Sequence, residues 1–265
     1  MIVDFHSHTV ESDGSLAPRA LVEKMERRGV RIFSVTDHDT MRAYASLGEV
    51  HATVVTGIEI NTSDGLNDVH VLGYRLPLEN EPLGDLLESN RRHRRLRVEA
   101  MVERLRAGGY PLALEDVLAE SSGDAIGRPH VAKALIRRGL VRDAETVFRT
   151  VLGRGGAGFV PSQHIVPADA IAAILAAGGV PVLAHPGRLH DDGIIASLVE
   201  MGLRGIEVFY PSHTTPQVAR YRELAGRYGL VMTAGSDFHD ARWRNRDVGV
   251  DVDARDIAPF LALVA

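Results

Sequence analysis

Two histidines near the N-terminus are the first residues whose type and spacing could bind a metal ion. In the opening stretch MIVDFHSHT, His6 and His8 lie two residues apart. Alternate side chains of an extended strand share a face, so both imidazoles would point to the same side as Asp4. Histidine is a common metal ligand, and two imidazoles at this spacing can reach one ion. The pattern alone is weak, because a pair of surface histidines would look the same.

Histidines and carboxylates recur along the chain, mostly where an apolar run ends. They occur in TDHD, GIEI, AHPG and GSDFH, inside the run HVLGY and in the first loop. The resulting candidate ligands are His6, His8, Asp13, His38, Glu59, His70, His185, Asp237 and His239. Grouping so many ionisable side chains would be costly through desolvation and repulsion unless a cation offset the cost. Helix caps and solvated turns would explain one or two of these residues, but not the set.

The chain contains no cysteine, so nitrogen and oxygen would be the metal donors. This donor set suits Mn, Zn or Fe better than Mg or Ca. Nine candidates are too many for one ion. Closely spaced divalent ions can hold a phosphoryl oxygen and generate hydroxide near neutral pH, which favours phosphoester over amide hydrolysis.

The elements that must position these residues follow from alternating Val/Ile-rich runs and amphipathic stretches, a pattern typical of a β/α fold with parallel strands. Strands are expected at residues 2–5, 32–35, 53–60, 69–74, 180–184, 205–209 and 230–234. Helices are expected at 18–28, with Ser15 as its cap, and at 168–177 and 254–264. Parallel β/α barrels gather their active sites at the C-terminal ends of the strands, where most candidate ligands fall. His70 lies within a strand but can still point inward.

The region from residue 78 to residue 160 shows helix periodicity without strands. Val98, Met101, Val102 and Leu105 fall at i, i+3, i+4 and i+7, and further helices are expected at 114–121, 130–138 and 144–152. We therefore expect a first barrel segment (1–77), a helical insertion that caps the substrate (78–160) and a second barrel segment (161–265).

Composition limits the classes of protein and partner. The chain has 265 residues, of which 45% are hydrophobic and 25% charged, as in globular enzymes. A net charge of −5 gives no global attraction for nucleic acid, so a polyanionic substrate would need local positive charge. The N-terminus lacks the pattern of a signal peptide, and no apolar run approaches the length that spans a bilayer. We expect a cytoplasmic protein without membrane contact or an obligate protein partner.

Together the motifs resemble those of a known family. HSHT, Asp13, TDHD, GIEI, the histidine of HVLGY, AHPG and GSDFH are similar, in order, to the motifs of the polymerase-and-histidinol-phosphatase (PHP) superfamily. In the expected insertion, IGRPHVAKALIRRG resembles the branch that includes nucleoside 3′,5′-bisphosphate phosphatases and 5′-end-processing exonucleases.

The resemblance implies a distorted (β/α)7 barrel that holds two to three divalent ions (Mn, Zn or Fe). It implies that one ion is held by His6, His8, Glu59 and Asp237. A second would be held by Glu59, His70 and His185, with Glu59 bridging. A third would be held by Asp13, His38 and His239.

Three residues outside this set are candidates for contact with the substrate. Arg128 in GRPH begins an expected helix, where an arginine is suited to grip phosphate bidentately; a surface arginine that caps the helix is the alternative. His130 could bind substrate or serve structure. His213, on the loop after VFYPS, could contact phosphate or protonate the leaving oxygen, or it could be an exposed loop histidine.

Two carboxylates are candidates for supporting catalysis. Glu207 would orient a ligand or a water molecule, and Asp37 would hold the second nitrogen of a histidine. The arginine-rich stretch NRRHRRLR (residues 90–97) favours a solvated helix face over an electrostatic guide for a nucleotide or an RNA 5′ end.

The leading hypothesis is a metal-dependent phosphoesterase that hydrolyses nucleoside 3′,5′-bisphosphates or short 5′-phosphorylated oligonucleotides by metal-activated hydroxide. A histidinol phosphate phosphatase is the alternative with the same chemistry. A metal-dependent amidohydrolase is the alternative from another class, although it would want a carbamylated lysine or another bridging group at a strand end. The only lysines, Lys24 and Lys133, fall in expected helices. A non-catalytic barrel is disfavoured by the complete ligand set.

Overall fold

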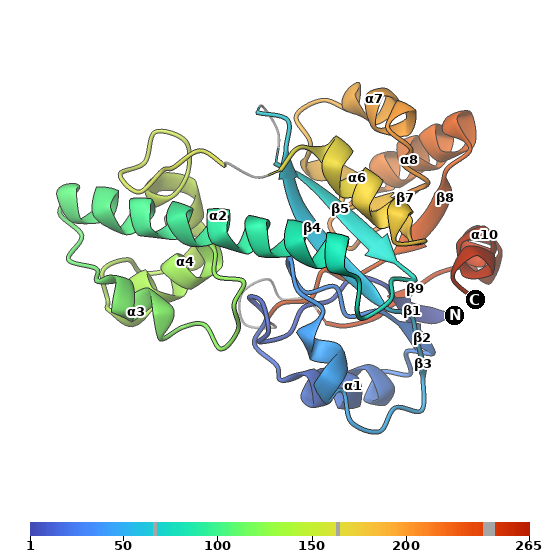
Figure 1. Ribbon diagram of the computed structural model, residues 1–265, viewed down its shortest axis with the longest axis horizontal. Coiled ribbons are helices and arrows are strands. Elements are labelled where there is room, and N and C mark those ends of the chain that lie inside the picture. Colours follow the sequence, from blue (N-terminus) through green and yellow to red (C-terminus); the bar gives the residue numbers. More distant parts are fainter. Residues whose placement is uncertain (66–67, 163–164, 241–246) are drawn as a thin grey trace.

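The computed structural model describes residues 1–65, 68–162, 165–240 and 247–265. Its strands form two sheets, with most helices on their outer faces and a helical region extending to one side (Figure 1). The first sheet has the order β3-β2-β1-β9. Its strands are β1 (Ile2–Asp4), β2 (Ile32–Phe33), β3 (Thr53–Val54) and β9 (Val250–Asp251). β1, β2 and β3 are parallel, whereas β9 runs antiparallel to β1.

The second sheet has the order β4-β5-β6-β7-β8 and is mixed. Its strands are β4 (Gly57–Ser63), β5 (Asp68–Tyr74), β6 (Val180–Leu183), β7 (Gly205–Phe209) and β8 (Val231–Ala234). β5 runs antiparallel to both of its neighbours, β4 and β6, while β6, β7 and β8 are parallel.

The expected mixture of strands and helices is confirmed, but the two sheets do not close into the expected (β/α)7 barrel. Near the donor side chains they meet through isolated bridges, Ser7 with Phe238 and His38 with Glu59. Two physical causes are visible. β4 and β5 pair antiparallel without a crossover helix between them, and β2 is only two residues long, so it ends before it can form a ladder with β4. A continuous ring needs strands with matched tilt and register at every step.

Two local expectations are also corrected. The expected strand at 53–60 is two strands in different sheets, β3 and β4. Ser15 does not cap the first helix, α1 (Pro18–Arg27), which begins after Ala17 with Pro18 in its first turn. The Ser15 hydroxyl instead donates to the His239 carbonyl (3.0 Å), so it ties the first loop to the segment after β8.

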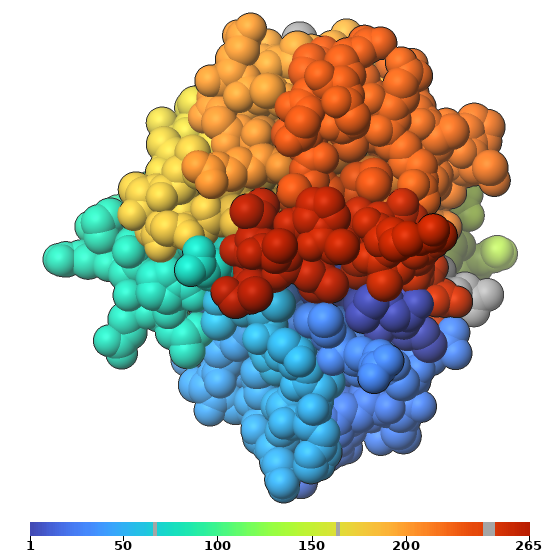
Figure 2. All heavy atoms as spheres, turned by 90° about the vertical axis from the view of Figure 1, so that its right-hand side faces the viewer, coloured from blue at the N-terminus to red at the C-terminus, as the bar shows by residue number. Residues whose placement is uncertain are grey.

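The remaining helices of the sheet-containing part pack on the sheets. They are η1 (Arg42–Ser46), α6 (Pro167–Ala176), η3 (Pro186–Arg188), α7 (Ile194–Glu200), α8 (Thr215–Tyr228) and α10 (Ala254–Val264). α10 lies between the N-terminal segment and the segment after residue 165, as the red band of Figure 2 shows. Its Phe260 packs edge-on against Phe5 (ring centroids 4.9 Å apart) and Tyr74 (5.0 Å), so this helix joins residues of both sheets in one core.

Residues 81–151, which we call the helical region, contain only helices and loops. The helices are α2 (Glu81–Ala107), α3 (Leu114–Leu118), α4 (Arg128–Arg137), α5 (Ala144–Thr146) and the π-helical turn η2 (Val147–Val151). The 27-residue α2 joins this region to the sheets (Figure 1). Its Leu83 and Leu87 belong to the apolar cluster of the second sheet, and its Met101 and Leu105 to a separate cluster inside the helical region. The division of the chain at residues 78 and 160 stays a prediction.

No helix in the described part of the chain is both long and apolar enough to cross a membrane.

Candidate metal centre

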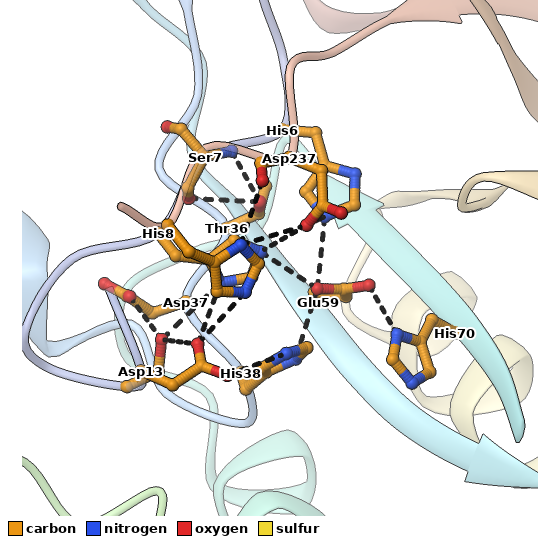
Figure 3. Close-up of polar contacts among 12 residues, drawn as sticks. His6, Ser7, His8, Asp13, Thr36, Asp37, His38, Glu59, His70 and Asp237 are labelled. Atoms are coloured by element: carbon orange, nitrogen blue, oxygen red, sulfur yellow. Dashed lines mark hydrogen bonds and ion pairs between the residues drawn. The ribbon is translucent and has the colours of Figure 1, made fainter. Parts of the chain in front are cut away.

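The nine side chains singled out in the sequence converge at the junction of the two sheets; we call them the donor cluster. Four of them, His6, His8, Glu59 and Asp237, have almost no exposed surface. The histidines come from the segment after β1, Glu59 from β4 and Asp237 from the segment after β8. Figure 3 shows His6, His8, Asp237 and Glu59 directed at a common point. One donor atom from each of the four lies within 4.8 Å of the others.

The spacing of these four donor atoms suits one cation. Glu59 Oε2 lies 3.1 Å from His6 Nε2 and 3.1 Å from His8 Nε2. Asp237 Oδ1 lies 3.6 Å and 3.5 Å from the same two nitrogens. Ligands bound at about 2.1 Å in tetrahedral or octahedral arrangement lie about 3.0–3.4 Å apart. The observed edges are close to these values, so a first-row divalent ion fits among the four.

Glu59 faces two sets of donors with its two oxygens. Oε2 faces His6, His8 and also His38 Nδ1 (3.1 Å). Oε1 faces His70 Nδ1 (2.7 Å) and His185 Nε2 (3.1 Å). The two oxygens of Glu59 therefore face different donor sets, and His70 points inward from its strand.

A third set lies on the other side of His8. Asp13 Oδ1 lies 3.2 Å from His239 Nε2, and Asp13 Oδ2 lies 3.6 Å from His38 Nε2. His8 Nδ1 lies 3.8 Å from Asp13 Oδ1, so His8 faces this set with the nitrogen that it does not direct at Glu59. The rings of His8 and His239 stack with centroids 4.0 Å apart, which brings the first and third sets of donors into van der Waals contact.

The donor cluster contains buried polar atoms that lack a hydrogen-bond partner. Within the described residues these include His6 Nε2, His8 Nε2, His38 Nδ1 and Glu59 Oε2. Each such atom costs free energy when it is buried without a partner. All four face the same small volume, so a bound cation would satisfy them together.

The pKa values describe the charge of the cluster without metal. Desolvation opposes protonation of His6, but Glu207 and Glu59 outweigh it and raise the pKa of His6 well above its usual value. Desolvation is likewise outweighed at His8, where Asp237 and Glu59 raise the pKa to about 9. Burial opposes ionisation of Glu59, but the facing histidines hold its pKa well below the usual value. The carboxylates thus attract positive charge, and protons on His6 and His8 supply it where a metal ion would.

Backbone conformation at the cluster is strained. His185 has φ +27° and Asp237 has φ +52°, values that residues with a side chain rarely adopt. Gly235 lets the end of β8 approach His6, because a Cβ atom on it would lie 2.2 Å from the His6 Cβ. Such strain is common where a side chain is held for function rather than for stability.

Glu207 contacts the outer nitrogen of His6 and so has the geometry of a residue that orients a ligand. Its Oε1 lies 3.0 Å from His6 Nδ1, and its Oε2 accepts a hydrogen bond from the backbone N–H of His185 (2.8 Å). A carboxylate on the outer nitrogen fixes the imidazole tautomer and leaves the inner nitrogen as a donor.

Within the part of the chain that the structure describes, Asp37 bonds no histidine nitrogen, which corrects the expectation from the sequence. Its carboxylate accepts hydrogen bonds from the Thr9 backbone (2.7 Å) and hydroxyl (2.6 Å) and from the Ser12 hydroxyl (2.6 Å). Asp37 therefore holds the loop that carries Asp13, because Thr9 and Ser12 of that loop donate hydrogen bonds to both of its carboxylate oxygens.

His213 and His130 both make hydrogen bonds within the protein, and their roles in substrate binding stay predictions. The Nδ1 of His213 bonds the Val208 carbonyl (2.9 Å), and its Nε2 accepts from the Gly187 N–H (3.2 Å). His130 is buried, and its Nδ1 accepts from the N–H of Gly127, the N-cap of α4 (3.1 Å). Neither residue lines the cavity described next.

A cavity of about 280 Å³ opens over the donor cluster, between the sheets and the helical region. Donor residues form its floor, and four basic residues of the helical region line it. We call them the cationic wall: Arg94, Arg97, Arg128 and Lys133. Val98, Met101 and Phe148 add apolar surface.

The arginine-rich stretch divides between two faces of α2. Arg92 and Arg95 are exposed and pair with Glu88 and Glu99, as expected for a solvated face. Arg94 and Arg97 turn inward, which corrects that expectation for them; their spacing of three residues was the signal in the sequence.

Sequence reasoning also missed Arg188, which lines the cavity and pairs with Asp237 Oδ2 (2.7 Å). Tyr210 donates to the same oxygen (3.0 Å). These two contacts fix the Asp237 oxygen that faces away from His6 and His8. The position of Arg188 directly after AHPG was the available signal.

Several curated relatives match most of the chain, although no protein-family model matches it. A 3′,5′-nucleoside bisphosphate phosphatase of Chromobacterium violaceum is 33% identical and covers 93% of this chain and 90% of its own. A phosphoribosyl 1,2-cyclic phosphate 1,2-diphosphodiesterase of Eggerthella lenta is 35% identical, with coverages of 96% and 100%. The 5′-3′ exoribonuclease Rnm of Escherichia coli is 32% identical, with coverages of 90% and 85%.

Two solved structures share the fold over nearly their whole length. A Bifidobacterium adolescentis protein, described as a candidate metal-dependent phosphoesterase, has a TM-score of 0.89 at 30% identity and covers 99% of this chain and 96% of its own. A Chromobacterium violaceum protein, described as an amidohydrolase with bound sulfate and no metal, has a TM-score of 0.91 at 29% identity, with coverages of 98% and 95%. With relatives of this identity and coverage, and with the donor cluster in place, the chain belongs to the PHP superfamily of metal-dependent phosphoesterases.

Proposed function

We propose that the protein hydrolyses a phosphoester of a ribose-containing nucleotide that carries a second phosphate group. The observation that carries the proposal is the pairing of two unlike surfaces across one cavity. His38 and Glu59, which carry buried donor atoms without partners, line its floor, and the cationic wall lies on its side. The first suits a metal-assisted reaction at phosphorus, and the second suits a phosphate that does not react.

The donor cluster would hold two or three divalent ions, with Mn, Zn and Fe as candidates. His6, His8, Glu59 and Asp237 would hold one, and Glu59 would share a second with His70 and His185. A third would lie among Asp13, His38 and His239. Bound ions would polarise a phosphoryl oxygen and lower the pKa of water, which is the chemistry that phosphoester hydrolysis needs. Glu207 would keep His6 oriented, and Tyr210 and Arg188 would do the same for Asp237.

Arg97 and Arg128 are the proposed contacts for the second phosphate. Burial and the neighbouring Arg128 lower the pKa of Arg97 to about 10, while Asp68 opposes the change. Asp68 pairs with Arg128 at 3.3 Å. An anion would relieve the repulsion between the guanidinium groups, and guanidinium binds phosphate bidentately.

The names of the relatives support this substrate class. A nucleoside 3′,5′-bisphosphate and a phosphoribosyl 1,2-cyclic phosphate each carry two phosphoester groups on one ribose. An exoribonuclease substrate carries successive phosphates along its chain. The sulfate in the related Chromobacterium violaceum structure shows that a tetrahedral oxyanion binds to that protein.

Amide hydrolysis is less well supported. The alternative would want a carbamylated lysine or another bridging group at a strand end, and Glu59 could serve as that group; what disfavours an amide is the cationic wall, which an uncharged amide would not need. Lys133 does line the cavity, which its place in a helix did not predict, but its Nζ donates to the Asp13 carbonyl (3.0 Å). Histidinol phosphate carries one phosphate and would leave Arg97 and Arg128 without a phosphate to bind. The cytoplasmic location and the lack of an obligate protein partner stay predictions.

The test is product release by metal-stripped protein to which Mn²⁺ is returned. The panel contains adenosine 3′,5′-bisphosphate, 3′-AMP, 5′-AMP, histidinol phosphate, a short 5′-phosphorylated RNA and an N-acyl amino acid. We expect turnover of the bisphosphate or the RNA to exceed that of the monophosphates. Preferred turnover of histidinol phosphate would overturn the substrate class, and turnover of the amide alone would overturn the reaction.

A further inference from the structure

Asp39 is a buried carboxylate that joins the donor cluster to the helical region. It follows His38 directly, is fully buried and adopts φ +54°. Its Oδ1 accepts from the Asn61 backbone N–H (3.2 Å) and from Asn90 Nδ2 (2.7 Å). Its Oδ2 accepts from Asn61 Nδ2 (2.9 Å) and from Arg94 Nη1 (3.4 Å). One side chain thus binds β4 and α2 together.

The same residue helps to place two members of the donor cluster. The backbone N–H of Asp39 donates to the Glu59 carbonyl (3.0 Å), within the bridge that pairs His38 with Glu59. Asn61, which holds the Asp39 carboxylate, lies two residues after Glu59 on the same strand. A shift of Asp39 would therefore move His38 relative to Glu59.

Three residues of α2 bind Asp39 from the side of the helical region. Asn90 and Arg94 contact the carboxylate, and Arg91 Nη1 donates to the Asp39 carbonyl (2.7 Å). Asn90 also donates to the Asn61 carbonyl (2.8 Å). These contacts lie at the part of α2 where the helix passes from the sheets to the helical region (Figure 1).

Arg94 carries the connection onward to the start of α4. Its Nε donates to the Ile126 carbonyl (3.0 Å) and its Nη2 to the Ala125 carbonyl (3.4 Å). A Cβ atom on Gly127 would lie 2.6 Å from Nη2, so glycine leaves the space that the guanidinium occupies. The next residue is Arg128, the proposed phosphate contact at the first position of α4.

We infer that Asp39 and Arg94 form a positioning pair that fixes Arg128 relative to the donor cluster. The pair sets the separation between the site of reaction and the site of the second phosphate. It therefore controls the preference for substrates that reach both sites over substrates that reach only the metals. The claim about substrate preference, the substrate part of this inference, rests on the proposed function. The claim that the pair fixes the position of Arg128, the mechanical part, does not.

The mechanical part is tested by hydrogen exchange on metal-free protein. Arg94→Gln removes the charge and the forked donors, and Arg95→Gln, on the exposed face of the same helix, is the matched control. We expect amide exchange in residues 125–131 to become about tenfold faster in Arg94→Gln only, because a charge-assisted contact is lost. Equal exchange in the two variants would overturn the inference.

The substrate part is tested by the ratio of kcat/KM for adenosine 3′,5′-bisphosphate to that for p-nitrophenyl phosphate. Because removal of one partner leaves a buried charge unpaired, the double variant Asp39→Asn/Arg94→Gln is measured beside Arg94→Gln. We expect the ratio to fall about tenfold in both variants, mainly through KM for the bisphosphate. Bound metal is measured in each variant, because Asp39 also helps to place His38 and Glu59. A constant ratio overturns the inference. If the wild type hydrolyses no phosphoester, the proposed function fails, and the exchange measurement still decides the mechanical part.

Discussion

The donor cluster and the cationic wall face the same cavity but are built in opposite ways. Donor residues come from strands and strand ends of both sheets, are mostly buried, and include several atoms without partners. Residues of the wall come from two helices, α2 and α4, and most of their donors already have protein acceptors, such as Val160 and Ser162 for Arg97. Rigid sheets can hold convergent donors at fixed distances, whereas the helical region supplies none of the nine donor side chains. The difference suggests that reaction type resides in one region and substrate choice in the other.

The largest effect on the donor cluster is expected from Glu59→Gln. The change keeps the shape of the side chain but removes the charge that faces both sets of histidines. We expect kcat to fall on the order of 10³-fold or more on every phosphoester, the scale of losing a central electrostatic contact. Metal content, measured by mass spectrometry, should fall with it. Glu88→Gln, an exposed change on α2, is the control. Full activity with full metal content would contradict the bridging geometry.

A smaller effect on the same region is expected from Glu207→Gln. The amide can still contact His6 Nδ1 but no longer favours the charge distribution of a bound imidazole. Loss of such an outer partner weakens metal affinity by about 10–100-fold. Excess Mn²⁺ should therefore restore most of the activity, unlike in Glu59→Gln. Activity that stays low at saturating metal would instead indicate that Glu207 contacts the reaction directly.

The donor side chains at the strand ends could be predicted from the sequence, because their positions depend on local periodicity. Alternation places His6 and His8 on one face, and the ends of parallel strands meet. Choices among tertiary partners could not be predicted. The oxygens of Asp37 were taken by Thr9 and Ser12, and both nitrogens of His213 by backbone groups. No local pattern distinguishes these partners from a histidine or a phosphate.

The helical region shows a second limit of sequence reasoning. Its helices follow from apolar spacing, but the inward turn of Arg94 depends on Asp39 and on the loop before Gly127, which lie far along the chain. Similarly, barrel closure depends on strand lengths and on the antiparallel β4–β5 pair, not on the β/α pattern alone. Charge runs are usually solvated, and here that rule held for one face of α2 only.

His130 allows a test of how the helical region is held together. Desolvation lowers the pKa of His130 to about 4, and the neutral ring caps α4. A lowered histidine pKa means that the unfolded state takes up a proton first as pH falls below about 6.5. Stability is therefore lost between about pH 6.5 and pH 4, by roughly 2–3 kcal/mol at pH 4.5.

The measurement is chemical denaturation of metal-free protein at pH 7 and pH 4.5. His130→Asn keeps a hydrogen-bond acceptor but does not titrate, so its stability should change less between the two pH values than that of the wild type. His51→Asn, at an exposed loop, serves as the control. An identical pH dependence in wild type and His130→Asn would show that the ring does not need to be neutral.

The smallest effect is expected from a change in the cationic wall, which should alter KM for one substrate and not for another. Arg128→Ala removes a cation that lies beside the cavity and keeps the donor cluster intact. Because one charge-assisted contact is worth about 1.5–3 kcal/mol, and the side chain is partly exposed, we expect the lower end, about a tenfold rise in KM for a bisphosphate. kcat and metal content should stay near wild type, and KM for p-nitrophenyl phosphate should not change. Arg92→Ala, whose side chain points to solvent from α2, is the control. An equal loss on both substrates would mean that Arg128 serves the reacting phosphate, and the separation between reaction and substrate choice would no longer hold.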